Sequence, residues 1–178
     1  GYHNTEDLDT ADVILINTCC VRETAEDKTL GKIGELKHLK KQNPDLIIAV
    51  TGCMAQEWQD KLFKRAPHID LVIGTHNIHK LIELIRERRS KADHYMAADM
   101  TLPAFHDMPV KRFQKFFAWI PIMNGCNKFC TYCIVPYVRG REVSRPIDAI
   151  VEEIKKVAAE GYKEITLLGQ NVNSYGLD

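Results

Sequence analysis

Short apolar runs alternate with helical patterns along the first half of the chain. The runs are rich in valine and isoleucine, which predicts buried strands. They occupy residues 12–17, 46–52 and 70–74. Between and after them, apolar side chains recur at helical spacing over residues 23–42, 56–64 and 77–89. The alternation predicts an α/β fold: a Rossmann-like domain over residues 1–90 with a parallel βαβαβα sheet, whose strands all end at one edge.

Two of these predicted helices carry further detail. Pro44 follows the helix over residues 23–42 and stops it, because proline cannot continue the backbone hydrogen bonds. The helix over residues 77–89 has one apolar stripe, which we expect to face the sheet. The stripe consists of Ile78, Leu81, Ile82 and Ile85.

The second half of the chain begins a different unit. Residues 91–115 have no sustained period and contain prolines and mixed charge, which predicts an interdomain linker. A strand, a long loop, a helix and a second strand then follow, at residues 116–124, 125–143, 144–161 and 163–169. Residues 116–178 therefore read as the first βαβ unit of a partial TIM-like barrel. Because this unit is unfinished, we expect the chain to be a piece of a longer protein.

Composition narrows the classes of protein that fit. Lysine and arginine number 24, and so do aspartate and glutamate, so no net charge draws the chain as a whole to nucleic acid. No apolar run is long enough to cross a bilayer, which predicts no membrane partner. The six cysteines are then expected in a reducing, cytoplasmic compartment, where clustered thiols indicate metal or redox chemistry more often than disulfides.

Three of the cysteines lie within eight positions of one loop. Cys126, Cys130 and Cys133 follow the strand over residues 116–124, at the strand end where parallel α/β folds place chemistry. A closed structural zinc site needs a fourth ligand, and no second CxxC pair follows Cys133. Three thiolates suit an iron–sulfur cluster with one open iron. The spacing favours a cluster, with zinc or a buried structural role as alternatives.

The other cysteines end the first two predicted strands. Cys19 and Cys20 follow the first strand and Cys53 follows the second, about one βαβ unit later. Parallel neighbouring strands would bring these thiols to one sheet edge, which favours a shared site over the alternative of small buried apolar residues. Cys20 is not expected to be a ligand, because adjacent side chains on extended backbone point to opposite faces.

Four stretches of the sequence resemble one enzyme family. CNKFCTYC has the CxxxCxxC pattern of radical S-adenosylmethionine (SAM) enzymes, including the aromatic Tyr132 before the last cysteine. The longer strings resemble the methylthiotransferases of that superfamily, most closely the branch of tRNA 2-methylthio-N6-dimethylallyladenosine synthases. They are GCNKFCTYCIVPYVRGREVSRP, LLGQNVNSYG, INTCCVRETAEDK and TGCMAQ, in a span from Ile16 to Gly176.

The resemblance implies the cofactors and the residues that hold them. Cys126, Cys130 and Cys133 would bind a [4Fe–4S] cluster, and SAM would occupy the open iron and be split to a 5′-deoxyadenosyl radical by an electron from the cluster. Weaker SAM contacts are implied for Tyr132, Gly169, Gln170 and Asn171. An intact family member carries a second [4Fe–4S] cluster, for which Cys19 and Cys53 match two ligands; its first ligand would lie upstream of this sequence.

The resemblance also implies a reaction and partners. The parent protein would add a methylthio group to C2 of isopentenylated adenosine beside the anticodon. Its partners would be the tRNA anticodon stem-loop and an electron-donor protein, with no role for DNA. Two alternatives remain open: a methylthiotransferase acting on threonylcarbamoyladenosine tRNA or a ribosomal protein, and a non-catalytic zinc or iron–sulfur module. The isolated 178-residue chain is expected to be inactive, since a closed barrel needs ~250 residues.

Overall fold

A computed structural model describes residues 2–91, 93–100, 110–112 and 116–178. The chain divides into two compact units, Gly1–Thr101 and Leu102–Asp178, and each is described by itself. Much of the predicted linker over residues 91–115 lies outside the described residues. No described helix is both long enough and apolar enough to cross a membrane.

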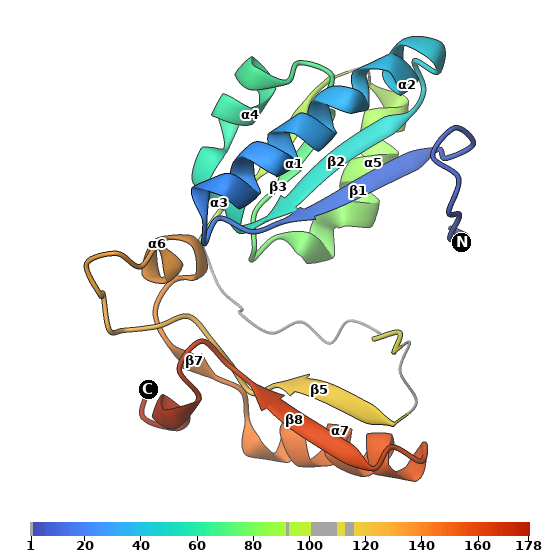
Figure 1. The fold of residues 1–178 in the computed structure, drawn as a ribbon. Helices are drawn as coiled ribbons and strands as arrows, with labels where there is room; N and C mark the ends of the chain where they lie inside the picture. The colour runs from blue at the N-terminus through green and yellow to red at the C-terminus, as the bar shows by residue number, and fades with distance from the viewer. Residues whose placement is uncertain (1, 92, 101–109, 113–115) are drawn as a thin grey trace. The chain divides into compact units, whose positions relative to one another are not determined.

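The first unit is built on a parallel four-stranded sheet in the order β1-β2-β3-β4. This arrangement confirms the predicted α/β class with a parallel sheet (Figure 1). The strands are β1 (Val13–Thr18), β2 (Ile47–Gly52), β3 (Leu71–Ile73) and β4 (Tyr95–Ala97). The fourth strand was not predicted. It lies inside the segment predicted as a linker. The sequence carries no signal for it, because three residues are too few to show a period of two.

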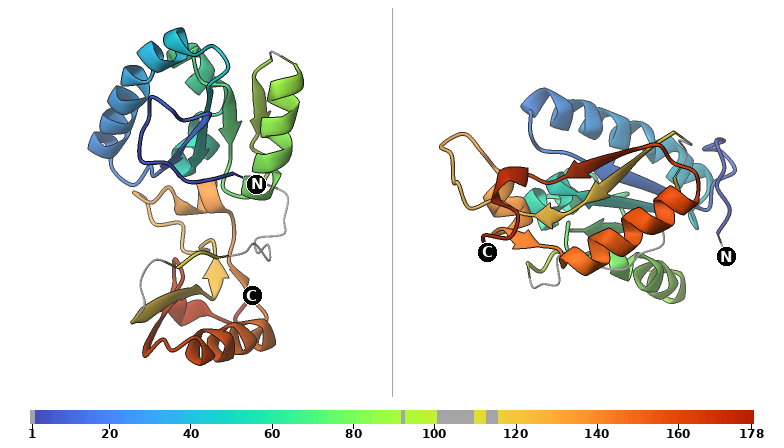
Figure 2. Two further views of the ribbon diagram at one scale, coloured as in Figure 1. Left: turned by 90° about the vertical axis from the view of Figure 1, so that its right-hand side faces the viewer. Right: turned by 90° about the horizontal axis from the view of Figure 1, so that it is seen from below.

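Helices cover both faces of this sheet (Figure 2). They are α1 (Glu23–Glu35), α2 (Lys37–Gln42), α3 (Cys53–Trp58), α4 (Asp60–Arg65), the 3₁₀ turn η1 (Ile78–Lys80) and α5 (Leu81–Ser90). Two helices predicted as continuous are each broken into a pair. The breaks fall at Leu36, whose NH bonds the carbonyl of Ile33 in a tightened turn, and at Gln59, which has a positive φ of 46°. Neither break falls on a proline or a glycine residue, the usual signals of a helix break in sequence.

The apolar face of α5 differs from the predicted stripe. Leu84 and Ile85 are buried against β2 and β3, and Leu81 packs beside them. Ile82, predicted to face the sheet, is 42% exposed. The prediction was wrong at this position because Leu81, Leu84 and Ile85 define the buried face of α5, and Ile82, one residue on from Leu81, is turned by about 100° away from it.

A buried carboxylate joins three elements of the first unit. Asp70, which directly precedes β3, has a side chain only 2% exposed. It lies 2.8 Å from the Lys40 ammonium of α2 and 2.8 Å from the Arg88 guanidinium of α5, and it accepts the backbone NH of Ile48 at 2.8 Å. Two cations and one NH thus satisfy one buried anion, as a charge in such a position requires.

The second unit pairs two parallel strands and covers one face with a helix. β5 (Phe117–Pro121) pairs with β8 (Glu164–Leu168), and α7 (Ile147–Ala159) buries Ile150 and Val157 against them. The predicted strand over 116–124 is divided, because its last two residues form a separate strand that pairs elsewhere. The remaining elements are β6 (Met123–Asn124), α6 (Val135–Arg139), β7 (Val143–Ser144) and η2 (Val172–Ser174).

Candidate metal centres

The three-cysteine loop is closed at its base by its own small sheet. β6 enters the loop and β7 leaves it, and the two pair antiparallel with Asn124 opposite Val143. Directly beyond this pair, the NH of Cys126 donates to the carbonyl of Gly140 at 3.1 Å. The loop therefore begins and ends at one place, beyond the carboxyl end of β5, where the sequence predicted a site.

The thiols of this loop are available to a ligand. All six cysteines of the chain are free, Cys130 is exposed, and Cys126 and Cys133 are half-buried. The NH of Cys133 donates to the carbonyl of Cys130 at 2.9 Å, which bends the CxxC segment into a turn. Within the described residues no three His, Cys, Asp or Glu side chains are already arranged around a metal position. The set of donors, three free thiols on one closed loop, fits an iron–sulfur cluster.

Gly125 is the residue that permits this closure. Its φ is +80°, a conformation that side chains rarely adopt. A Cβ at this position would lie 2.0 Å from the carbonyl oxygen of Arg141 and 2.6 Å from that of Gly140. Both close atoms belong to backbone, so the two sides of the loop would have to move apart to admit any side chain.

We expect Gly125→Ala to open the loop. The cost is the ~1–2 kcal/mol of a left-handed alanine plus the clash with the opposite backbone. Limited trypsin digestion in the loop, at Arg139 and Arg141, should then be clearly faster than in the parent chain. Gly161→Ala is the matched control, because Gly161 has a φ of +95° but nothing within 4 Å of its would-be Cβ. Equal digestion of the two variants would show that the clash has no consequence.

The residues after β8, predicted as SAM contacts, lie against the base of the loop. A Cβ on Gly169 would lie 2.5 Å from Cγ of Met123, so this glycine allows β6 to pack closely. Gln170 accepts the NH of Gly125 through Oε1 at 2.7 Å, and Asn171 donates through Nδ2 to Oε1 of Glu142 at 3.1 Å. The hydrogen bond from Asn171 is the main cause that lowers the pKa of the Glu142 carboxyl. Their predicted contacts with SAM stay predictions.

Glu142 is a residue of this site that the sequence reading missed. Its NH donates to Oδ1 of Asn127 at 3.1 Å, while its carboxylate accepts from Asn171. It thereby links the exit of the loop to its entrance and to the segment after β8. Only the structure could identify it, because a glutamate among arginines is typical of a solvated turn.

Exposed aromatic rings surround the same loop. Tyr132 is 91% exposed, and no described residue covers its ring. Its predicted contact with SAM also stays a prediction. Phe129, with a positive φ of 44°, packs edge-to-face against Tyr137, and the Arg141 guanidinium lies 5.5 Å from the Phe129 ring centre. The rings give the loop an apolar rim beside its thiols.

The cysteines of the first unit meet at one sheet edge, as predicted. Thr18 at the end of β1 pairs with Gly52 at the end of β2, and Cys19 and Cys53 are the next residues of each strand. The hydroxyl of Thr18 donates to the carbonyl of Thr51 at 2.6 Å and ties the two strand ends together. Register thus places the two predicted ligands at matching positions, although their assignment to a cluster stays a prediction.

Cys20 differs from its neighbour in environment. Cys19 is exposed, whereas Cys20 is 8% exposed and Cys53 7% exposed. Burial, followed by the nearby Cys53 and Cys19, raises the pKa of Cys20 to about 12. The two adjacent side chains differ in burial, as the alternation of side chains on extended backbone predicts, and the expectation that Cys20 is not a ligand stays a prediction.

The burial difference predicts an order of thiol reactivity. In the metal-free, reduced chain, Cys19 and Cys130 should be alkylated by iodoacetamide at least about tenfold faster than Cys20, because only exposed thiols reach the reagent. Mass spectrometry of timed digests measures each site. In denaturing urea all six should react alike. Equal rates for Cys19 and Cys20 in the folded chain would contradict the described edge.

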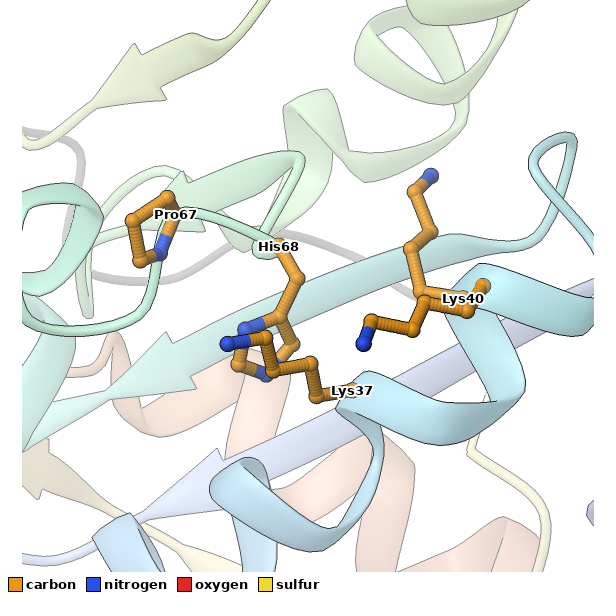
Figure 3. Close-up of a pocket in the computed structure, with 5 residues that line it drawn as sticks. Lys37, Lys40, Pro67 and His68 are labelled. Carbon is orange, nitrogen blue, oxygen red and sulfur yellow. The ribbon is translucent and has the colours of Figure 1, made fainter.

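A separate hollow on the first unit is lined by basic residues and is shown in Figure 3. Its lining consists of Lys37, Lys40, Lys41, Pro67 and His68. The Lys40 ammonium is already bound to Asp70, and Nε2 of His68 lies 2.7 Å from the Ile33 carbonyl oxygen. The hollow lies near the start of β2 and β3, the opposite end of the sheet from Cys19 and Cys53. It is not part of the thiol site.

Comparisons with known proteins match both units of the chain. Residues 1–74 match the uncharacterized protein family UPF0004, and residues 120–176 match the Radical SAM superfamily. Over its whole length the chain is 50% identical to the tRNA-2-methylthio-N(6)-dimethylallyladenosine synthase of Bacillus licheniformis, 49% to that of Bacillus subtilis strain 168 and 52% to that of Staphylococcus aureus strain Newman. The chain belongs to the radical SAM methylthiotransferase family.

The match has a defined extent. The chain spans about a third of the length of these methylthiotransferases: 36% of the two Bacillus proteins and 35% of the Staphylococcus protein. The two family models fall on different units, one on the unit with Cys19 and Cys53 and the other on the unit with the three-cysteine loop. Each thiol group therefore lies within one of the two matched segments.

Proposed function

We propose that the protein containing this chain is a tRNA methylthiotransferase that replaces the hydrogen at C2 of isopentenylated adenosine with a methylthio group. The relatives that match the whole chain at 49–52% identity are named as synthases of this modified base. The observation that carries the proposal is the closed loop after β6, which presents three free thiols beyond the end of a parallel strand. This is the place and the number of donors that a SAM-binding cluster needs.

The residues of the loop have defined roles in this proposal. Cys126, Cys130 and Cys133 would hold a [4Fe–4S] cluster through three irons and leave the fourth iron open to SAM. With SAM, the cluster supplies the one-electron chemistry, and the protein supplies binding and orientation. Phe129 and Tyr137 pack edge-to-face within the same loop, and Phe129 directly precedes Cys130 in sequence.

The edge formed by β1 and β2 would serve a second cluster. Cys19 and Cys53 lie at matching strand ends and would provide two thiolates, and the family resemblance implies a further ligand upstream of this sequence. Cys20 is not assigned as a ligand in this proposal. The family resemblance implies that this second cluster would take part in sulfur delivery, which would account for two thiol sites in one chain.

The proposed substrate base can be reached without opening an RNA duplex. An adenosine beside the anticodon lies in a single-stranded loop, where a base is read by splaying it out of the stack. The tRNA anticodon stem-loop and an electron-donor protein are the proposed partners, in the cytoplasm. A branch that modifies threonylcarbamoyladenosine or a ribosomal protein, and a purely structural metal module, are the competing outcomes.

Nucleoside analysis tests this function. The whole protein is expressed in a bacterial strain that lacks its own methylthiotransferases, and digested tRNA is examined by mass spectrometry. We expect 2-methylthio-N6-dimethylallyladenosine to appear, and to disappear in the Cys130→Ala variant made in the same protein. Methylthiolated threonylcarbamoyladenosine instead would place the protein in the other branch. No modified nucleoside from a protein that carries its clusters would overturn the proposal.

A further inference from the structure

We propose that Gln170 and Asn171 are positioning residues, which hold the base of the three-cysteine loop in the shape that binds its cluster. This inference rests on the proposed function, since it concerns the same loop. It gives the two side chains a task that is complete before SAM binds, in place of the cofactor contact that the sequence predicted for them.

Gln170 holds the entrance of the loop. Its Oε1 accepts the NH of Gly125 at 2.7 Å, across 45 positions of sequence. Gly125 directly precedes Cys126, and its backbone has a φ of +80°, a conformation that residues with a side chain rarely adopt. The amide of Gln170 therefore fixes the peptide from which the first thiol projects. A glutamate carboxylate at this position could accept the same backbone NH.

Asn171 holds the exit of the loop. Its Nδ2 donates to Oε1 of Glu142 at 3.1 Å and also contacts the Ser174 hydroxyl. The NH of Glu142 in turn donates to Oδ1 of Asn127, the residue that follows Cys126. Two consecutive side chains after β8 thus reach the first and the last residues of one loop. Replacing either side chain by alanine would release only one end of the three-cysteine loop.

The segment that carries these side chains is itself anchored. The hydroxyl of Tyr175 donates to the carbonyl of Arg145 at 2.8 Å, and the NH of Gly176 donates to Oγ of Ser144 at 2.9 Å. The Asp178 carboxylate accepts the NH of Ser144 at 2.8 Å. The residues that follow η2 are therefore bound to Ser144 and Arg145 by contacts that involve neither Gln170 nor Asn171. Supporting residues position a site only when they are fixed themselves, and this condition is met.

The test compares iron retention with SAM binding in the 178-residue chain, reconstituted anaerobically with iron and sulfide. Gln170→Ala and Asn171→Ala should lose the loop's cluster to a chelator about two- to tenfold faster than the parent chain, the range expected when one hydrogen bond is removed. Gln170→Glu keeps an acceptor for the Gly125 NH and should restore slow loss. The Kd for SAM, measured by titration on the fraction that still holds its cluster, should stay unchanged in all three.

Three outcomes are distinguishable. Full iron retention with weakened SAM binding would assign the side chains to the cofactor and overturn the inference. Faster iron loss that Gln170→Glu does not restore would also overturn it, because the lost contact would then not be the acceptor. A parent chain that takes up no iron would overturn the proposed function instead. Asn173→Ala, an exposed neighbour in η2, is the matched control and should behave as the parent does.

Discussion

The Cys130→Ala variant, reconstituted without oxygen, should contain about four iron atoms and about four sulfides fewer than the parent chain. The loop offers three thiols, and two cannot hold a cubic cluster in place. Cys130 is exposed, so its replacement removes a ligand without leaving a cavity in the core. Iron and sulfide analysis after desalting measures the difference directly.

Variants at the other cysteines show whether the loss is specific. Cys53→Ala should leave the loop's cluster intact and affect only iron held at the β1–β2 edge. Cys20→Ala should change neither, because Cys20 is not expected to be a ligand. An iron content in Cys130→Ala equal to that of the parent would show that the loop holds no cluster.

Asp70→Ala should destabilise the first unit by about 3–5 kcal/mol, the range observed when one partner of a buried ion pair is removed. The substitution leaves the Lys40 and Arg88 cations without their anion, and the NH of Ile48 without its acceptor. All three groups lie at the amino ends of β2 and β3, so the sheet loses its alignment there. Denaturant unfolding followed by circular dichroism measures the free energy of unfolding.

Asp60→Ala provides the comparison for this loss. Asp60 pairs with Lys64 at 2.9 Å on the outer side of α4, where solvent surrounds both side chains. Exposed pairs of this kind contribute little. We expect no resolved change in the unfolding midpoint. If Asp70→Ala unfolded at the same denaturant concentration as Asp60→Ala, the buried network would have no role in stability.

The sequence predicted those parts of the fold that strong periods specify. The strands β1, β2 and β3 are apolar runs, and parallel α/β topology brings their ends to one edge, so the register of Cys19 with Cys53 was accessible without a structure. The break between α3 and α4 at Gln59 and the strand β4 were not accessible. The first is a local backbone conformation without glycine or proline, and the second is set by pairing with β3.

The candidate site divides in the same way. The three thiols of the loop were predicted because metal ligands have characteristic spacings in sequence. The hydrogen bonds between Gln170 and Gly125 and between Asn171 and Glu142 were not predicted. They join residues 45 and 29 positions apart, and such contacts depend on how the loop folds back. Sequence spacing identifies ligands, whereas the residues that orient them appear only in three dimensions.

The central claim is that the loop of Cys126, Cys130 and Cys133 binds a cluster with one iron open to SAM. Electron paramagnetic resonance of the reconstituted, dithionite-reduced chain tests it most directly. We expect a reduced [4Fe–4S] signal whose g-values change when SAM is added, and no SAM-dependent change in Cys130→Ala. A chain that takes up iron and sulfide but gives the same spectrum with and without SAM would contradict the account.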